Sequence, residues 1–202
     1  MLYGMKILQR LFRVGACLLV PLVMLSNTVQ AQSDASGPVV INGCGIWPHA
    51  QCQGKDLRHA NLAYRNLAGA DFTGAKLARA DFTGANLAGA IFDDADLTAA
   101  KLVKATAPTA SFKRAKLIGA NLEFARIFRA DFSGADLTAA NLEAARSNFA
   151  WFDGARLSNA NLQETKFFSV RLTNANLEGA FRRFTVFLDC SMEGCVGCPK
   201  EE

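Results

Sequence analysis

The segment Ala70–Ala90 reads ADFTGAKLARADFTGANLAGA and contains four successive copies of one five-residue pattern. The pattern continues in both directions without insertion or deletion, and it covers residues 55–189 in 27 units. The third residue of each unit, here called the centre, is Leu, Phe or Ile in 24 units, and the residue two before it is Ala in 22. A period of five fits neither a helix nor a strand. We therefore expect a stacked repeat in which each unit buries its apolar face against its neighbours.

A second period of twenty residues lies on top of the first. Every fourth centre belongs to a uniform series: one series runs from Phe72 to Phe152 and another from Leu57 to Leu177. Like residues at this spacing predict four units per coil, with Phe stacked on Phe and Leu on Leu. The centre and the small Ala would then point inward, and the other three residues of each unit would point outward.

The units resemble those of the pentapeptide-repeat family, and the resemblance covers residues 55–189. It implies an all-β fold, a right-handed quadrilateral parallel β-helix with four repeats in each of about seven coils. Gly recurs just before the Ala position, for example at Gly69, Gly74 and Gly84. Since Gly tolerates the positive φ of tight turns, we expect these positions to lie at the corners.

The sequence around the repeats divides the rest of the chain. We expect a secretory signal peptide at 1–31, an N-terminal lead-in and cap at 32–54, the repeats at 55–189 and a cysteine-containing cap at 190–202. Residues 1–31 combine three basic residues, the apolar run Val14–Leu25 and a small-residue cleavage pattern ending at Ala31. The run is too short to span a bilayer, so we expect export, with the periplasm as the compartment. Cleavage would change the net charge from +4 to +4 − 3 = +1.

Export to an oxidising compartment favours disulfides over metal ligation for the five cysteines of the mature chain. Nearly seven coils would hold the two ends of the repeat region roughly 30 Å apart. Disulfide Cα atoms lie within about 7 Å of each other. We therefore expect Cys44 to pair with Cys52, and two of Cys190, Cys195 and Cys198 to pair with each other. The remaining thiol could join two copies of the chain, and the C-x-x-C spacing of the last two cysteines leaves thiol redox chemistry as an alternative.

Three centres are neither Leu, Phe nor Ile: Ala107, Ser147 and Arg182. The first would leave a thinner core. At Ser147 we expect a local distortion in which Phe149 replaces the missing apolar centre. Arg182 would mark the polar end of the core, with Phe181 and Phe184 folded over it.

The search for catalytic or ligand-binding motifs gives no candidate. The two histidines, His49 and His59, lack metal-ligand spacing, and no nucleophile–base pair or phosphate-binding loop stands out. Asp or Asn precedes the centre in many units, and we expect these side chains to face solvent and hydrogen-bond the backbone between coils. The sequence thus predicts a protein that is not an enzyme, with no cofactor, no metal and no small-molecule substrate.

One side of the predicted rod changes character along its length. On the third face, whose centres begin with Leu67 and Leu87, the outward residues of the early coils are small or polar. In later coils the outward residues at or beside this face are aromatic and basic: Arg126, Phe128, Arg129, Arg146, Phe149, Trp151, Lys166 and Phe168. Exposed aromatic residues beside Arg are typical of protein–protein interfaces. The alternative is that Phe149 and Phe168 are covered by local loops or by the C-terminal cap.

These features together predict an exported, non-catalytic scaffold that binds a protein partner, or a second copy of itself, through these residues. The family resemblance implies an alternative, because some pentapeptide-repeat proteins mimic duplex DNA and protect topoisomerases. Such mimicry needs a strongly acidic surface, whereas the mature chain is close to neutral. The interleaving of acidic and basic residues around the rod likewise argues against nucleic-acid binding.

Overall fold

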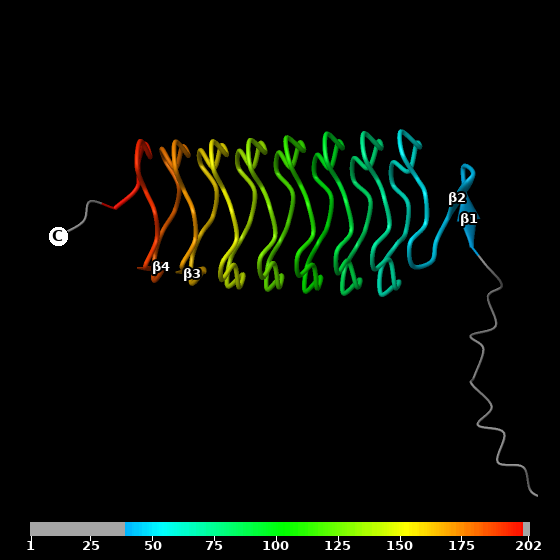
Figure 1. Ribbon diagram of the computed structural model, residues 1–202, viewed down its shortest axis with the longest axis horizontal. Coiled ribbons are helices and arrows are strands. Elements are labelled where there is room, and N and C mark those ends of the chain that lie inside the picture. The colour runs from blue at the N-terminus through cyan, green and yellow to red at the C-terminus, as the bar shows by residue number, and fades with distance from the viewer. Residues whose placement is uncertain (1–38, 200–202) are drawn as a thin grey trace, which may run out of the picture. The chain divides into compact units, whose positions relative to one another are not determined.

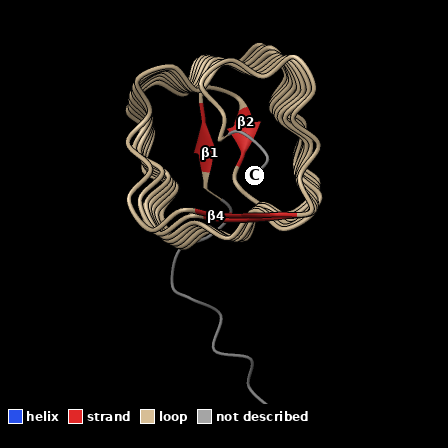
Figure 2. Cartoon of the chain, turned by 90° about the vertical axis from the view of Figure 1, so that its left-hand side faces the viewer, coloured by secondary structure: helices blue, strands red, loops and turns tan. Residues whose placement is uncertain are grey.

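Successive coils of the chain lie one upon another in the computed structural model, which describes residues 39–199 (Figure 1). Parallel bridges join residues twenty apart, from Gln51 with Asp71 to Asn176 with Val196, so each coil takes four repeats. The predicted right-handed quadrilateral β-helix is confirmed, and the coils trace a square when seen end-on (Figure 2). The predicted signal peptide lies outside the described residues.

We name the four faces by their first centres. The first face begins with Leu57, the second with Leu62, the third with Leu67 and the fourth with Phe72.

Four segments of the described chain form strands longer than a single bridge. β1 (Val40–Ile41) and β2 (Cys44–Gly45) make an antiparallel hairpin. β3 (Lys166–Phe168) and β4 (Val186–Leu188) pair in parallel on the third face. Among residues 39–199 no helix is long and apolar enough to cross a membrane.

Inward-pointing side chains fill the rod in the columns that the sequence predicts. The Phe column from Phe72 to Phe152 is fully buried, and its successive ring centroids lie between 4.6 and 5.0 Å apart. The column from Leu57 to Leu177 is equally buried, and so is most of the Ala column between the centres. Each buried Leu or Phe contributes roughly 1.5–3 kcal/mol, so these columns are the main source of stability.

Tight turns form the corners of the square. At most corners the carbonyl of the centre accepts the N–H three residues later, as Phe72 accepts from Ala75 at 2.9 Å. The residue before the Ala position has a positive φ in every repeat, for example 63° at Gly74 and 56° at Ala139. A positive φ at the third turn residue alone is the mark of a type II turn. The expectation that the recurrent Gly lies at the corners is confirmed.

The Asp or Asn before the centre accepts hydrogen bonds from the turn that follows it. Asp71 accepts the N–H of Thr73 at 2.9 Å and the Thr73 hydroxyl at 2.6 Å. Asn121 and Asp136 make the same bond to the residue two positions later. The expectation that these side chains bond the backbone between coils is therefore wrong for most of them. They satisfy an N–H that the bonds between coils leave free.

The irregular centre Ser147 fits into the core without distortion. It is fully buried, and its hydroxyl donates to the carbonyl of Lys166 at 2.9 Å. Phe149 instead points outward and is 44% exposed, so the prediction that it replaces the missing centre is wrong. The small side chain fits the column because its one polar group finds an acceptor.

The C-terminal end of the rod also differs from the prediction. Arg182 donates to the carbonyl of Gly197 at 2.6 Å. Phe181 and Phe184 are 53% and 66% exposed, so they do not fold over the end of the core. The outward positions of the repeat carry both rings away from the axis.

A disulfide lies at each end of the described chain. Cys44 bonds to Cys52 and Cys195 bonds to Cys198, while Cys190 keeps a free thiol. The first pairing is the one predicted, and the second resolves which two C-terminal cysteines pair. Cys52 lies where the Phe column would continue, so its bond fixes the β1–β2 hairpin against the N-terminal end of the core.

Candidate protein-binding surface

The residues singled out on the third face lie close together in the later coils. We call them the aromatic–basic strip: Arg126, Phe128, Arg129, Arg146, Phe149, Trp151, Lys166 and Phe168. All of them are exposed except Phe168, which is half-buried within β3. The N-terminal coils of the same face carry Asn66 and Asn86 at the positions that are basic later on.

An aromatic cluster forms the middle of the strip. The rings of Phe128 and Phe149 meet edge to face with centroids 5.4 Å apart. The Arg129 guanidinium lies 5.4 Å from the first ring and 5.9 Å from the second. Phe128 is 39% exposed and Phe149 is 44% exposed, so both rings remain open to solvent. The two contacts with Arg129 hold the rings in place without covering them.

Trp151 extends the cluster around the corner onto the fourth face. It is 43% exposed, and the guanidinium of Arg171 from the next coil lies 6.0 Å from its ring. A hollow of about 400 Å³ lies beside Trp151, and its lining includes Phe149, Arg129, Lys113 and Asp131. Aromatic walls with a few charged groups are typical of the pockets that receive an anchoring side chain at protein interfaces.

The alternative, in which loops or the C-terminal cap cover these rings, does not hold for Phe149. Within residues 39–199 no segment covers it, because the coils continue in register through this region without an inserted loop. Phe168 is half-buried within β3, which pairs with β4 of the next coil.

The basic residues of the strip form a ladder. Arg126 is the bridge partner of Arg146, which is in turn the bridge partner of Lys166. Their side chains therefore leave the third face from equivalent positions in three successive coils. Among the described residues, none of the three makes an ion pair with a carboxylate.

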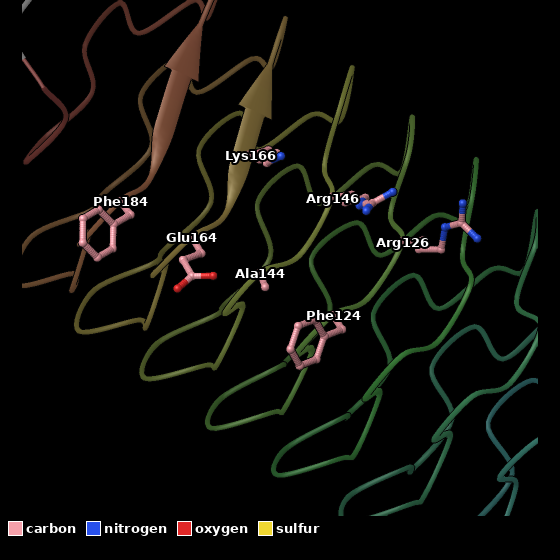
Figure 3. A pocket seen from close by; sticks show the side chains of 7 residues that line it. All are labelled: Phe124, Arg126, Ala144, Arg146, Glu164, Lys166 and Phe184. Carbon is pink, nitrogen blue, oxygen red and sulfur yellow. The ribbon is translucent and has the colours of Figure 1, made fainter.

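A groove beside this ladder includes residues that the sequence analysis did not assign to the site. It has a volume of about 600 Å³ and lies at the corner where the second face turns into the third (Figure 3). Phe124, Ala144, Glu164 and Phe184 line one side, and the basic ladder lines the other. These four positions are twenty residues apart, a spacing that could have grouped them in the sequence. Ala144 and Glu164 are neither aromatic nor basic, however, so the residue types did not indicate a shared site.

The free thiol does not have the surroundings of a reactive cysteine. Cys190 is half-buried, and its Sγ donates to the carbonyl of Phe167 at 3.2 Å. Burial raises the pKa of the Cys190 thiol above its ordinary value. Cys195 and Cys198, the candidate redox pair, are joined by a disulfide in a segment without a helix.

Neither histidine belongs to a group of possible metal ligands. His49 and His59 both occupy corner positions with φ near 60°. In the described part of the chain no cluster of three or more His, Cys, Asp or Glu side chains could hold a metal ion.

The family model described as pentapeptide repeats matches the chain in eight copies, over residues 49–77, 56–94, 66–102, 109–143 and 148–181. These matches cover more than half of the chain. The chain belongs to the pentapeptide-repeat family. The matched segments 109–143 and 148–181 include the coils that carry the strip.

Several solved pentapeptide-repeat structures are similar to this one. HetL, involved in heterocyst differentiation regulation in the cyanobacterium Nostoc sp. strain PCC 7120, shows 31% identity over 73% of this chain and 70% of HetL, with a TM-score of 0.31. A pentapeptide repeat protein from the Arabidopsis thaliana thylakoid lumen shows 31% identity over 48% of this chain and 60% of its own, with a TM-score of 0.33.

QnrB1, a plasmid-mediated fluoroquinolone resistance protein, shows 18% identity over 74% of this chain and 80% of its own, with a TM-score of 0.44. No curated protein sequence matches the chain.

Proposed function

We propose that this pentapeptide-repeat protein is an exported, non-catalytic scaffold that binds a protein partner, or a second copy of itself, through the aromatic–basic strip. The observation that carries the proposal is the pair of exposed rings at Phe128 and Phe149, with Arg129 against both. Exposing apolar rings to water is unfavourable, and clustered aromatic and Arg side chains are the composition of interface hot spots.

The rest of the rod supports this choice of surface. The outward positions of the early third face are small or polar, so the aromatic cluster is confined to a few coils. Those coils are rigid, because the backbone of each one bonds to the coils on both sides. A rigid surface orders few residues on binding, which reduces the entropic cost of association. The two disulfides fit an oxidising compartment, in agreement with export.

A site-specific photo-crosslinking experiment tests the proposal. A photoreactive residue placed at Phe128 in the exported protein should give a discrete crosslinked product in its host. The matched control is Tyr64, which is 79% exposed but lies in an early coil, at the corner between the second and third faces. Equal crosslinking from both positions would contradict the proposal.

Absolute mass by light scattering, with and without reductant, identifies which partner is bound. A dimer that persists in reductant and is lost in the Phe128→Ser, Phe149→Ser variant would assign the strip to self-association. A monomer that still crosslinks from Phe128 would assign it to a different protein.

A further inference from the structure

The groove beside the aromatic–basic strip has a charge pattern that differs from the rest of the rod. On the first face, basic and acidic residues alternate in successive coils, as Asp96, Lys116, Asp136 and Arg156 do. Arg156 contacts Asp136 at 2.8 Å, and Arg114 contacts Asp94 at 2.7 Å in the same coil-to-coil manner. On the third face, Arg126, Arg146 and Lys166 follow one another with no acid between them.

This ladder is unfavourable for the isolated protein. Adjacent bridge partners lie about 4.8 Å apart, and like charges directly opposite each other destabilise a sheet. In addition, the basic side chains cannot accept a hydrogen bond from the backbone N–H two residues later, as Asp and Asn do at the same position in other units. The N–H groups of Phe128 and Asn148 thus lack the side-chain acceptor that Asp71 gives to Thr73. Anionic groups bound in the groove would offset the repulsion and provide acceptors.

The opposite side of the groove adds apolar contacts. Phe124 and Phe184 are 48% and 66% exposed and lie three coils apart, roughly 14 Å at the spacing between strands. Ala144 lies between them and leaves the groove open (Figure 3). The guanidinium of Arg183 lies 4.8 Å from the ring of Phe184 and brings a further cation to that end.

We propose that this groove binds an extended acidic peptide segment of a partner protein, which lies along the rod axis. A strand advances about 3.3 Å per residue, so four or five residues span the distance between the two rings. Alternate acidic side chains, about 6.6 Å apart on one side of that strand, would face the ladder, where Arg forks bind carboxylates through paired hydrogen bonds. Apolar side chains at the ends of the segment would contact Phe124 and Phe184.

A nucleic acid fits the groove less well than a peptide. Tight non-specific binding of nucleic acid requires many phosphate contacts along a continuous basic track. The ladder offers only three cations over about 10 Å, too few for such a track. The inference rests on the proposed function, since it names the partner chemistry of a groove that shares its basic ladder with the strip.

The test is a binding titration of the oxidised protein with a fluorescein-labelled peptide of about five residues, which spans the distance between Phe124 and Phe184. The peptide alternates Glu with Ser and carries Phe at both ends. We expect saturable binding that weakens as salt is added. The same peptide with Gln in place of Glu should bind at least about tenfold more weakly.

Two matched variants localise the binding. Arg126→Gln, Arg146→Gln, Lys166→Gln should weaken peptide binding at least about tenfold. The first-face variant Lys76→Gln, Lys116→Gln, Arg156→Gln loses the same charge and should change peptide binding less than about twofold. Ala144→Phe fills the groove without a charge change and should also weaken binding. The corner tolerates this residue, because Phe124 and Phe184 have the same φ region in the same row.

The inference is overturned if the acidic peptide does not bind, if the Gln peptide binds equally well, or if both charge variants behave alike. Tighter binding of a single-stranded oligonucleotide than of the peptide would also overturn it. A failed peptide titration together with strong crosslinking from Phe128 would remove the acidic-peptide groove and leave the proposed function standing. If the peptide does not bind and Phe128 gives no crosslinked product, both proposals are wrong.

Discussion

The rings of Phe112 and Phe132 lie 4.6 Å apart and within 1° of parallel, and both are fully buried. The two residues are the same centre in consecutive coils, and each of the two rings is stacked between two others. The backbone around them bonds to the neighbouring coils on every face. This backbone cannot move inward to fill a cavity, so removing one ring should leave a cavity of nearly the full volume of the ring.

We expect Phe112→Ala to lower the free energy of unfolding by about 3–5 kcal/mol. The matched control is Phe128→Ala on the surface of the same rod, where the edge-to-face pair and the Arg129 contact account for about 1–2 kcal/mol. Denaturant unfolding followed by far-UV circular dichroism measures both. Equal losses in the two variants would mean that the Phe column is not the core.

The corner turns predict the effect of a single methyl group. Gly154 has a φ of 63°, and a Cβ added there would meet no atom within 4 Å. Gly154→Ala therefore tests backbone strain alone, and we expect a loss of about 1 kcal/mol. The converse change Ala139→Gly, at a φ of 56°, relieves the same strain and should cost nothing or stabilise the fold slightly. Thermal unfolding should therefore show a lower melting temperature for Gly154→Ala and an equal or higher one for Ala139→Gly.

The carboxylates at the turns should make the stability of the fold depend on pH in acid. Burial raises the pKa of Asp136, but the hydrogen bonds from Thr138 and Arg156 outweigh this effect and lower the pKa below its ordinary value. At the exposed Asp56, the hydrogen bond from the Arg58 side chain lowers the pKa to about 2. A lowered pKa means that the ionised form stabilises the fold above about pH 4, and that this contribution is lost as the pH falls toward 2.

The melting temperature should therefore fall steeply between pH 4 and pH 2, measured by circular dichroism at fixed ionic strength. Asp136→Asn keeps an acceptor for Thr138 and removes the titrating group, so its melting temperature should depend less on pH in that window. An unchanged acid dependence in this variant would show that Asp136 does not contribute.

The free thiol should be poorly reactive in the native protein. Its burial and its bond to the Phe167 carbonyl disfavour the thiolate, so a thiol reagent should modify Cys190 at least about tenfold more slowly than in the unfolded chain. Cys190→Ser should also leave the mass in solution unchanged without reductant. Fast native labelling would contradict this and restore covalent dimerisation through the thiol.

The sequence by itself determined the repeat, the register and the core. An unbroken period of five within a period of twenty specifies the stacking, since a coil shifted by one residue would place Ser111 and Lys116 where Phe112 and Leu117 now lie. The end-to-end distance of so many coils also fixed the pairing of Cys44 with Cys52. These properties follow from local geometry repeated along the chain, which a linear pattern records completely.

Only the tertiary structure decided the positions that break the pattern. Whether Ser147 distorts its coil depends on an acceptor nineteen residues away, the carbonyl of Lys166. The exposure of Phe149 and Phe184 depends on which neighbouring segments cover them, and the pattern does not encode this. The groove arises because Ala144 lies between larger side chains from other coils. Surface shape is set by neighbours one coil away, and it becomes visible only when the coils are stacked.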